Sequence, residues 1–405
     1  MKKIDKIIFT GQMLRKNTKP SEWIYNLFAW SIKNLTGLDT YLTTISDAQW
    51  INKDYHIPLN IGKIYNCFGK KYTYGCTQTK AFSEQWASVY YNTEYNKEFY
   101  DYVYSIFKDS LVISYELEDC MIAALDYFKI PYIEINLDPI RFLEDAMLCF
   151  RSSDKNVYKK ILKYRVDEEF LYLSANYLST VYKLAQKKHE DSKNVLFLGQ
   201  TTCDKTIVDK EKNEMYSILN HKEEFLESIK GFDKVFYKRH PLVKDDEDVI
   251  EFIKSQSEIE IIEDNFYELI SRDDIEKVVS ISSGTCSEAK YFGKETQCLL
   301  KEGVPRQIED KIELDKYVSV YQSFFSLNFW AEILSPLLKT RKLSKQYSIE
   351  GAKNKLRDSR NAYSIYYAYK DPQYLFSKDQ SIENLSEKIF KSFLAYEMEK
   401  EEYDI

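Results

Sequence analysis

Between residues 194 and 301 the sequence alternates short apolar runs with amphipathic segments, and only brief polar turns separate them. The runs NVLFLGQ, KVFYKRHP and EKVVSIS are typical of buried strands, and the segments between them have helical spacing. Strands and helices that alternate with short connections predict a doubly wound parallel sheet. In the first half, the runs DSLVISYE and PYIEINLDP bracket a helical period and predict a βαβ unit of a second such sheet.

The sequence therefore predicts an α/β protein made of two doubly wound, Rossmann-like domains that face a cleft. A polar stretch, KKHEDSKN, favours a boundary near residue 190. We expect an N-terminal domain over 1–190, a C-terminal domain over 191–310, and a helical tail over 311–405 that packs back on the N-terminal domain. Residues 84–107 are expected to form one long aromatic helix.

Composition narrows the class of protein. The net charge of −7 argues against a general nucleic-acid binder, which would carry a basic surface. Seven cysteines without a CxxC pair indicate a reduced, cytoplasmic chain, and four histidines without ligand spacing predict no metal site. The start, MKKIDKIIFTG, is expected to be a first strand rather than a signal peptide, and no apolar run approaches the ~20 residues that span a bilayer.

Ligands of doubly wound sheets bind at the carboxyl ends of the strands, and three predicted strands of the C-terminal domain end in unusual residues. After the first, LFLGQTTCD, the side chains of Gln200 and Thr201 offer hydrogen-bond donors and Asp204 offers a carboxylate. The alternative is an ordinary loop capped by Thr and Asp side chains.

The second strand ends in Lys238, Arg239, His240 and Pro241. Pro241 biases the residue before it toward an extended backbone, so His240 is expected to be held at the strand end, where it can donate to a phosphate oxygen. Lys238 and Arg239 point to opposite faces of a strand, so one of them is expected to pair with a carboxylate or phosphate. A histidine in a satisfied surface turn is the alternative.

The third strand is followed by Ser282, Ser283, Gly284 and Thr285, at the start of a predicted helix. Backbone N–H groups at a helix start, together with Ser and Thr hydroxyls, can bind a phosphate. Glu288, one turn later, could accept ribose hydroxyls. The alternative is a simple N-cap with Glu288 closing a capping box. Together the three strand ends predict a pocket for a phosphate that carries a sugar or nucleoside.

These residues resemble a family. The His240-Pro241 turn followed by the turn from Ser282 to Ala289 is similar to bacterial GT-B transferases that use CMP-activated acid sugars, namely sialyltransferases and the Kdo transferases of capsule and O-antigen synthesis. The GQTTCD loop and the first-half segment 115–148 look closer to the retaining β-Kdo transferases. The acidic motif of the sialyltransferases has no full copy, because ELEDC lacks the glycine.

The resemblance implies the GT-B architecture, a CMP-Kdo donor and no metal or other cofactor. It implies that His240 and the turn from Ser282 to Thr285 hold the CMP phosphate, that Glu288 lies near the ribose or cytosine, and that Lys238 or Arg239 serves the donor carboxylate. It aligns Asp204 with the loop carboxylate that the retaining enzymes use as nucleophile.

Acidic residues of the N-terminal domain are candidates for the acceptor side. Glu116, Glu118 and Asp119 follow a predicted strand, and Glu118 is expected to be the catalytic base if the reaction inverts. The alternative is a helix start whose acids favour the dipole. Arg141, and with it Glu144 and Asp145, is expected near the acceptor or in a structural contact.

Several functions stay open. The first is transfer of Kdo to a surface polysaccharide or glycolipid with retention, at the inner face of the cytoplasmic membrane. The others are an inverting sialyltransferase, a UDP-sugar epimerase of similar architecture, and a non-catalytic scaffold of a polysaccharide assembly complex. Because such acceptors are lipid-linked, peripheral membrane contact is expected.

Overall fold

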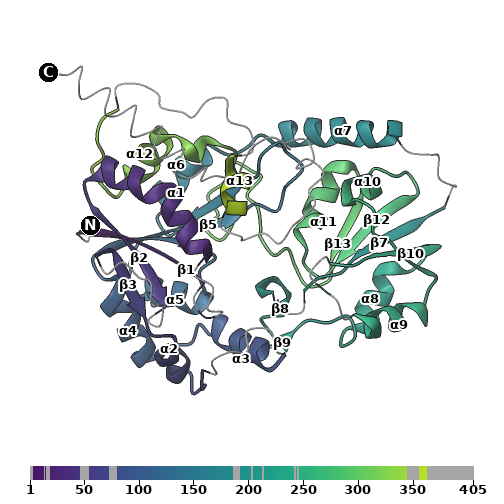
Figure 1. Cartoon of the computed structure of the whole chain (residues 1–405), viewed down its shortest axis with the longest axis horizontal. Helices are drawn as coiled ribbons and strands as arrows, with labels where there is room; N and C mark the ends of the chain where they lie inside the picture. Colours follow the sequence, from purple (N-terminus) through teal and green to yellow (C-terminus); the bar gives the residue numbers. More distant parts are fainter. Residues whose placement is uncertain are drawn as a thin grey trace.

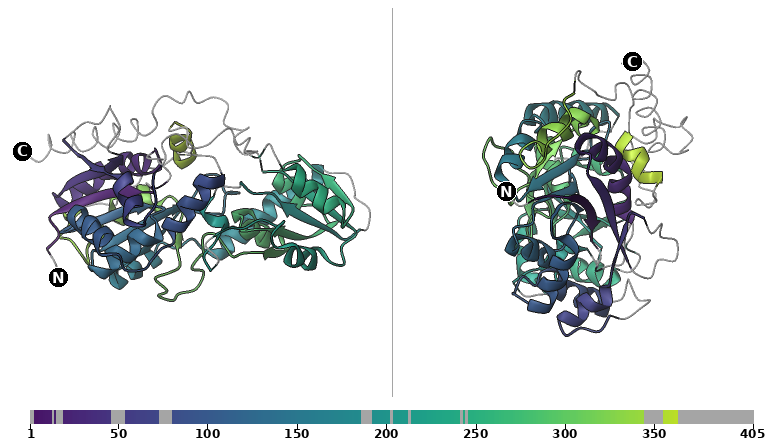
Figure 2. Two further views of the ribbon diagram at one scale, coloured as in Figure 1. Left: turned by 90° about the horizontal axis from the view of Figure 1, so that it is seen from below. Right: turned by 90° about the vertical axis from the view of Figure 1, so that its left-hand side faces the viewer.

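The computed structural model describes residues 3–12, 14, 19–45, 54–72, 80–185, 192–201, 204–211, 214–240, 243, 246–343 and 355–362. Two α/β units lie side by side along the long axis of the molecule (Figures 1 and 2). Each unit is built on its own sheet, one of seven strands and one of five.

The sheet of the first unit has the order β14-β6-β5-β4-β1-β2-β3. Its parallel strands are β1 (Lys6–Gly11), β2 (Asp39–Ile45), β3 (His56–Leu59), β4 (Ser110–Tyr115) and β5 (Tyr132–Leu137). Beside β5 the sheet continues with β6 (Leu148–Ser152), which is antiparallel to β5, and then with β14 (Val318–Val320), which is antiparallel to β6. Every residue of β4 and β5 is buried, as expected for parallel strands covered on both faces.

Helices cover both faces of this sheet (Figure 1). One face packs against α1 (Lys19–Thr36), α6 (Lys155–Leu162) and α12 (Leu327–Leu334), around Trp23, Phe150 and Trp330. The other packs against α2 (Ile61–Cys67), α3 (Lys80–Tyr90), α4 (Lys97–Phe107) and α5 (Asp119–Tyr127). The single helix expected over 84–107 is wrong: it is divided into α3 and α4, because the side chain of Asn96 caps the start of α4 by accepting from Phe99 N at 3.0 Å.

The second sheet has the order β11-β10-β7-β12-β13, with all strands parallel. The strands are β7 (Asn194–Leu198), β10 (Lys234–Lys238), β11 (Ile259–Ile261), β12 (Ile275–Ser280) and β13 (Glu295–Cys298). Val195 and Phe197 face α8 (Lys222–Ile229) and α9 (Glu247–Lys254), whereas Leu196 and Leu198 face the opposite layer. That layer contains α10 (Phe266–Ile270), α11 (Gly284–Ala289) and η2 (Lys290–Phe292). The predicted α/β class with two doubly wound units is confirmed.

The path of the chain between the units differs from the expected one. Helix α7 (Glu168–Ala185), placed by the sequence in the N-terminal domain, packs on the second unit: Leu171 and Ala175 share a core with Leu269. After β7, a short excursion made of η1 (Lys205–Ile207), β8 (Val208–Asp209) and β9 (Glu214–Met215) reaches the first unit, where Val208 joins the core.

The segment expected to be a helical tail contains a strand. Val318 and Val320 are buried and pair with β6, so β14 is part of the first sheet. It is followed by η3 (Ser323–Phe325) and α12, and α13 (Lys355–Ala362) lies against the first unit through the contact between Trp23 and Ser359. Residues 344–354 and 363–405 of the expected tail lie outside the described residues.

Candidate functional site

The loops after β7 and β12 are joined by Gln200. Its amide donates to Ser282 Oγ at 3.1 Å and accepts from Ser282 N at 2.6 Å. Gly199, just before it, has no room for a side chain: a Cβ would lie 2.9 Å from Tyr237 Oη and 3.2 Å from His240 N. Strand order reverses between β7 and β12, which is where doubly wound sheets bind ligands. Gln200, Ser282 and His240 therefore meet at the expected edge.

His240 lies half-buried, two residues beyond the end of β10. Burial lowers the pKa of His240; Asp204 acts in the opposite direction, and Arg141 adds to the lowering. The carboxylate of Asp204 and the guanidinium of Arg141 are thus near enough to influence the imidazole. At neutral pH the ring is neutral and offers one donor and one acceptor.

The carboxylate of Asp204 is fixed at the start of the excursion. Its Oδ1 accepts from Thr206 N at 2.9 Å and from Thr206 Oγ1 at 3.0 Å. The next residue, Lys205, is buried against the first unit: its carbonyl accepts from Tyr91 Oη at 2.8 Å and its Nζ lies 3.7 Å from Glu116 Oε1. Asp204 therefore stands where the second unit meets the first.

The Ser-rich turn after β12 is held mainly by its own hydroxyls. Ser283 caps α11, its Oγ lying 2.7 Å from Thr285 Oγ1, and its N–H donates to Ser280 Oγ at 3.0 Å. Gly284 packs against Pro139, whose Cβ would lie 2.8 Å from an added Cβ. The close contact between the units thus requires glycine at this position. Thr201 is half-buried beyond Gln200, and Pro241 lies outside the described residues.

Glu288 has a different place from the one that the sequence predicted. Its side chain is buried, and Oε1 accepts from Arg141 N at 2.7 Å and from Tyr267 Oη at 2.8 Å. This oxygen fixes the backbone of Arg141 and so connects the two units, which argues against the predicted contact of Glu288 with ribose or cytosine.

Lys238 and Arg239 are also engaged within the second unit. Lys238 Nζ donates to the carbonyl of Asp264 at 2.6 Å, and burial lowers the pKa of Lys238. Arg239 Nε lies 3.2 Å from a carboxylate oxygen of Asp246, which also accepts from Tyr237 Oη. Both cations thus have structural partners, which argues against the predicted role of either in holding a donor carboxylate.

The acids after β4 divide into two kinds. Glu118 is buried, and its Oε1 accepts from Leu14 N at 2.9 Å, which argues against its predicted role as catalytic base. Glu116 and Asp119 pair instead with Lys205 and Lys210 of the excursion. The acceptor-side acids thus hold the two units together.

Asp145, from the segment that follows β5, is buried and caps α13. It accepts from Leu356 N at 3.1 Å and from Arg357 N at 3.2 Å, while Glu144 is exposed. The structural alternative for Asp145 therefore holds, and of the three candidates in this segment Arg141 is the one whose charge contributes to lowering the pKa of His240.

Arg306 was not predicted, although it lies at the centre of a buried junction. Its guanidinium donates to Tyr291 Oη at 2.6 Å and to Ser319 Oγ at 2.8 Å, and lies 3.2 Å from Glu168 and 3.6 Å from Asp138. The neighbouring Asp138 raises the pKa of Arg306 despite burial. An isolated arginine between two strands carries no sequence signal that could have revealed this network.

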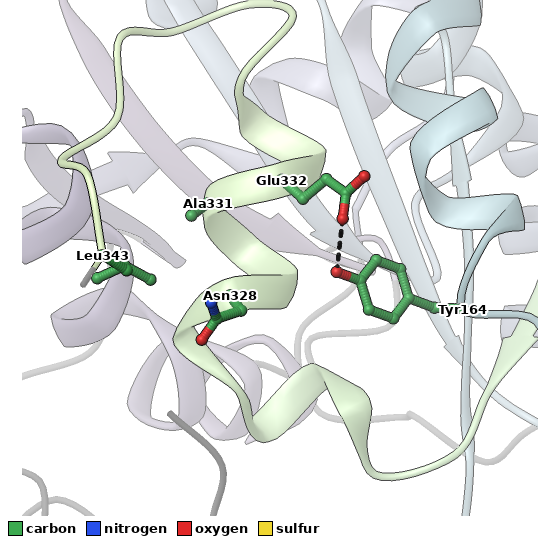
Figure 3. Close-up of a pocket in the computed structure, with 5 residues that line it drawn as sticks. All are labelled: Tyr164, Asn328, Ala331, Glu332 and Leu343. Atoms are coloured by element: carbon green, nitrogen blue, oxygen red, sulfur yellow. Dashed lines mark hydrogen bonds between the residues drawn. The ribbon is translucent and has the colours of Figure 1, made fainter. Parts of the chain in front are cut away.

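A pocket lies on the first unit, away from this site (Figure 3). Its lining comes from α12 and nearby segments: Tyr164, Asn328, Ala331, Glu332 and Leu343. Burial raises the pKa of Glu332, but hydrogen bonds from Lys163, Tyr164 and Lys160 outweigh burial and lower it to about 2. None of the predicted site residues lines this pocket, whose polar contacts tie α6 to α12.

Across the described ranges, no three His, Cys, Asp or Glu side chains lie close enough to form a metal site. Over the same residues, every helix is too short or too polar to cross a bilayer.

The sequence matches no protein-family model and no curated protein. Among solved structures, the chain is similar to the β Kdo 2,7 transferase of Thermosulfurimonas dismutans KpsC, with 16% identity over 63% of this chain and 86% of that one and a TM-score of 0.32. It is also similar to the β Kdo 2,4 transferase of the same protein, with 15% identity, coverage of 59% and 84%, and a TM-score of 0.30.

A UDP-GlcNAc 2-epimerase from Methanocaldococcus jannaschii, solved with UDP-GlcNAc and UDP, is similar as well. It shares 12% identity over 85% of this chain and 95% of that one, with a TM-score of 0.27. The similar structures thus include the β-Kdo transferase class that the strand-end motifs resemble. At these values they say nothing about the reaction of this chain, which has to be inferred from its own residues.

Proposed function

We propose that this chain is a glycosyltransferase that moves Kdo from CMP-Kdo to a bacterial surface polysaccharide or glycolipid, with retention. The observation that carries the proposal is the meeting of Gln200, Ser282 and His240 at the carboxyl edge of the second sheet, with Asp204 held on the loop that follows Gln200. The charges of Asp204 and Arg141 both act on the imidazole of His240. The carboxylate of Asp204 can serve as a nucleophile. The neutral imidazole of His240 and the guanidinium of Arg141, which belong to different units, can donate hydrogen bonds to an anion.

The proposed reaction has two displacements. The Asp204 carboxylate attacks the anomeric carbon as the sugar–phosphate bond breaks, and CMP leaves with the electron pair of that bond. The acceptor hydroxyl then attacks the same carbon, passes its proton to the acceptor nitrogen of the neutral His240 ring and displaces the carboxylate, so two inversions give retention. Negative charge grows on the leaving phosphate, where an N–H of His240 and the hydroxyls of Ser283 and Thr285 can stabilise it.

Kdo carries a carboxylate of its own, which requires a cation. Lys238 is held by the carbonyl of Asp264 and Arg239 by Asp246, so Arg141 is the proposed partner of the donor carboxylate. The hydrogen bond from Arg141 N to Glu288 fixes the backbone from which that guanidinium projects. Glu116, directly after β4, and Asp119, at the start of α5, pair with Lys205 and Lys210 and are proposed to line the acceptor side of that contact. Lipid-linked acceptors would bring the chain to the inner face of the membrane.

The test is release of CMP by the purified full chain from CMP-Kdo, compared with CMP-sialic acid and with UDP release from UDP-GlcNAc. We expect release from CMP-Kdo alone, and we expect it to be unchanged by a chelator, since the proposed steps use no metal. Release from CMP-sialic acid instead would indicate a sialyltransferase, and turnover of UDP-GlcNAc an epimerase. Absence of turnover with all three donors and every acceptor tried would favour a scaffold.

A further inference from the structure

Helix α7 has two apolar faces, and the described residues cover only one of them. Leu171 and Ala175 are buried on the second unit, with Leu178 and Tyr182 packed beside them. A second stripe along the same helix is from 42% to 84% exposed and consists of Phe170, Leu173, Tyr177, Val181 and Leu184. The helix runs along the outer edge of the molecule, above α10 (Figure 1). Exposed apolar patches of this kind mark interaction surfaces.

The spacing of the stripe is symmetric. Its members follow one another at intervals of three, four, four and three residues, centred on Tyr177. Intervals of three and four residues keep side chains on one face of a helix, where a second helix can pack against them. Because the pattern reads the same in both directions, an antiparallel copy would match it residue for residue. Phe170 would meet Leu184 of the second copy, Leu173 would meet its Val181, and Tyr177 would meet Tyr177.

We propose that α7 is the contact between two copies of this chain, which pack their α7 helices antiparallel about a two-fold axis at Tyr177. Such an axis makes each contact occur twice, as in most homodimers. Charge favours the antiparallel direction: Glu168 and Glu169 lie in the first turn of the helix, and a parallel partner would bring the acidic ends of the two copies together. Antiparallel packing keeps these two ends apart.

The composition of α7 argues against a lipid surface as the partner. Interfacial helices that bind anionic bilayers carry lysines and arginines on their polar face. The helix has two acidic residues and a single basic one, Lys183, whose Nζ lies 2.6 Å from Asp273. The exposed positions beside the stripe include Asn176 and Thr180, which are uncharged. A second protein surface suits this pattern better than phospholipid headgroups.

Sedimentation velocity of the full chain tests the proposal. The concentration should run from about 1 to about 100 µM, because a contact made by one helix of each copy is small for a stable dimer. We expect a dimer of about twice 48.1 kDa, and a shift to the monomer in L173E and Y177E. Both side chains are exposed, so neither change disturbs the core. The matched control N176E, at an exposed polar position outside the stripe, should remain dimeric. A monomer over the whole range, or dimers in L173E and Y177E, would overturn the proposal.

Cross-linking tests the position of the axis. A short bis-maleimide should join two copies of Y177C, because Tyr177 meets itself, and should not join L184C, which meets Phe170. Equal cross-linking of both variants, above that of the unaltered chain, would contradict the antiparallel geometry. Binding of the monomer to anionic vesicles that is lost in Y177E would assign the stripe to lipid instead.

Discussion

Asp204→Asn is expected to lower sugar transfer by about 10³-fold or more, the size of loss seen when a catalytic carboxylate is removed. The amide cannot attack the anomeric carbon, so the first displacement fails. Asn keeps an Oδ1 that can accept from Thr206 N, as Asp204 does at 2.9 Å, so the start of η1 should remain capped. CMP should therefore bind the variant about as well as it binds the unaltered chain.

Two measurements separate these effects. Transfer from CMP-Kdo gives the rate, and calorimetry with CMP gives the affinity for the leaving group. Mass spectrometry of the unaltered chain, quenched during turnover, should show a covalent sugar on the peptide that contains Asp204. Thr206→Val is the matched control: it removes a hydroxyl that contacts the same carboxylate but leaves the nucleophile. Near-normal transfer by the Asp204→Asn variant would show that the assignment of the nucleophile is wrong.

Arg306→Met is expected to have the largest effect on stability, lowering the free energy of unfolding by about 3–5 kcal/mol, because it leaves a buried partner charge behind. Asp138 is fully buried and lies 3.6 Å from Arg306 Nε, and Glu168 and Tyr291 also contact the guanidinium. The methionine fills a similar volume but neutralises none of the carboxylates.

Urea denaturation followed by circular dichroism measures the change. The double variant Arg306→Met with Asp138→Asn removes the buried carboxylate charge as well and should recover part of the loss. Lys163→Met is the control for an exposed ion pair, since Lys163 pairs with Glu332 at the surface and its loss should cost at most about 1 kcal/mol. If Arg306→Met and Lys163→Met lowered the free energy of unfolding by equally small amounts, the junction at Arg306 would contribute little to stability.

The strands of the second sheet were the most predictable part of the fold. All five residues of β7 are buried, and an apolar run between polar turns is the pattern expected for a central parallel strand. Strand β14 was missed because it has three residues, too few to show a period. Helix α7 was assigned to the wrong unit because its spacing shows that one face is buried but not which sheet buries it.

For the candidate site, the sequence predicted which residues lie at the edge of the sheet better than it predicted the contacts that their side chains make. Gln200, His240 and Ser282 meet at one edge because the carboxyl ends of parallel strands lie together, a property of topology that alternation reveals. The contacts of Glu288 with Arg141 and of Glu118 with Leu14 depend on segments more than 100 residues away in sequence. Nothing in the local pattern distinguishes such a buried acceptor from an acid that faces a ligand.

The central claim is that the carboxyl edge of the second sheet, where Gln200, Ser282 and His240 meet, binds a CMP-activated sugar. Calorimetric titration of the full chain with CMP, and with UDP as the control, tests it most directly. The account predicts binding of CMP but not of UDP, and loss of CMP binding in His240→Ala while the circular dichroism spectrum is unchanged. Absence of CMP binding by the folded chain, or CMP binding that His240→Ala leaves intact, would contradict it.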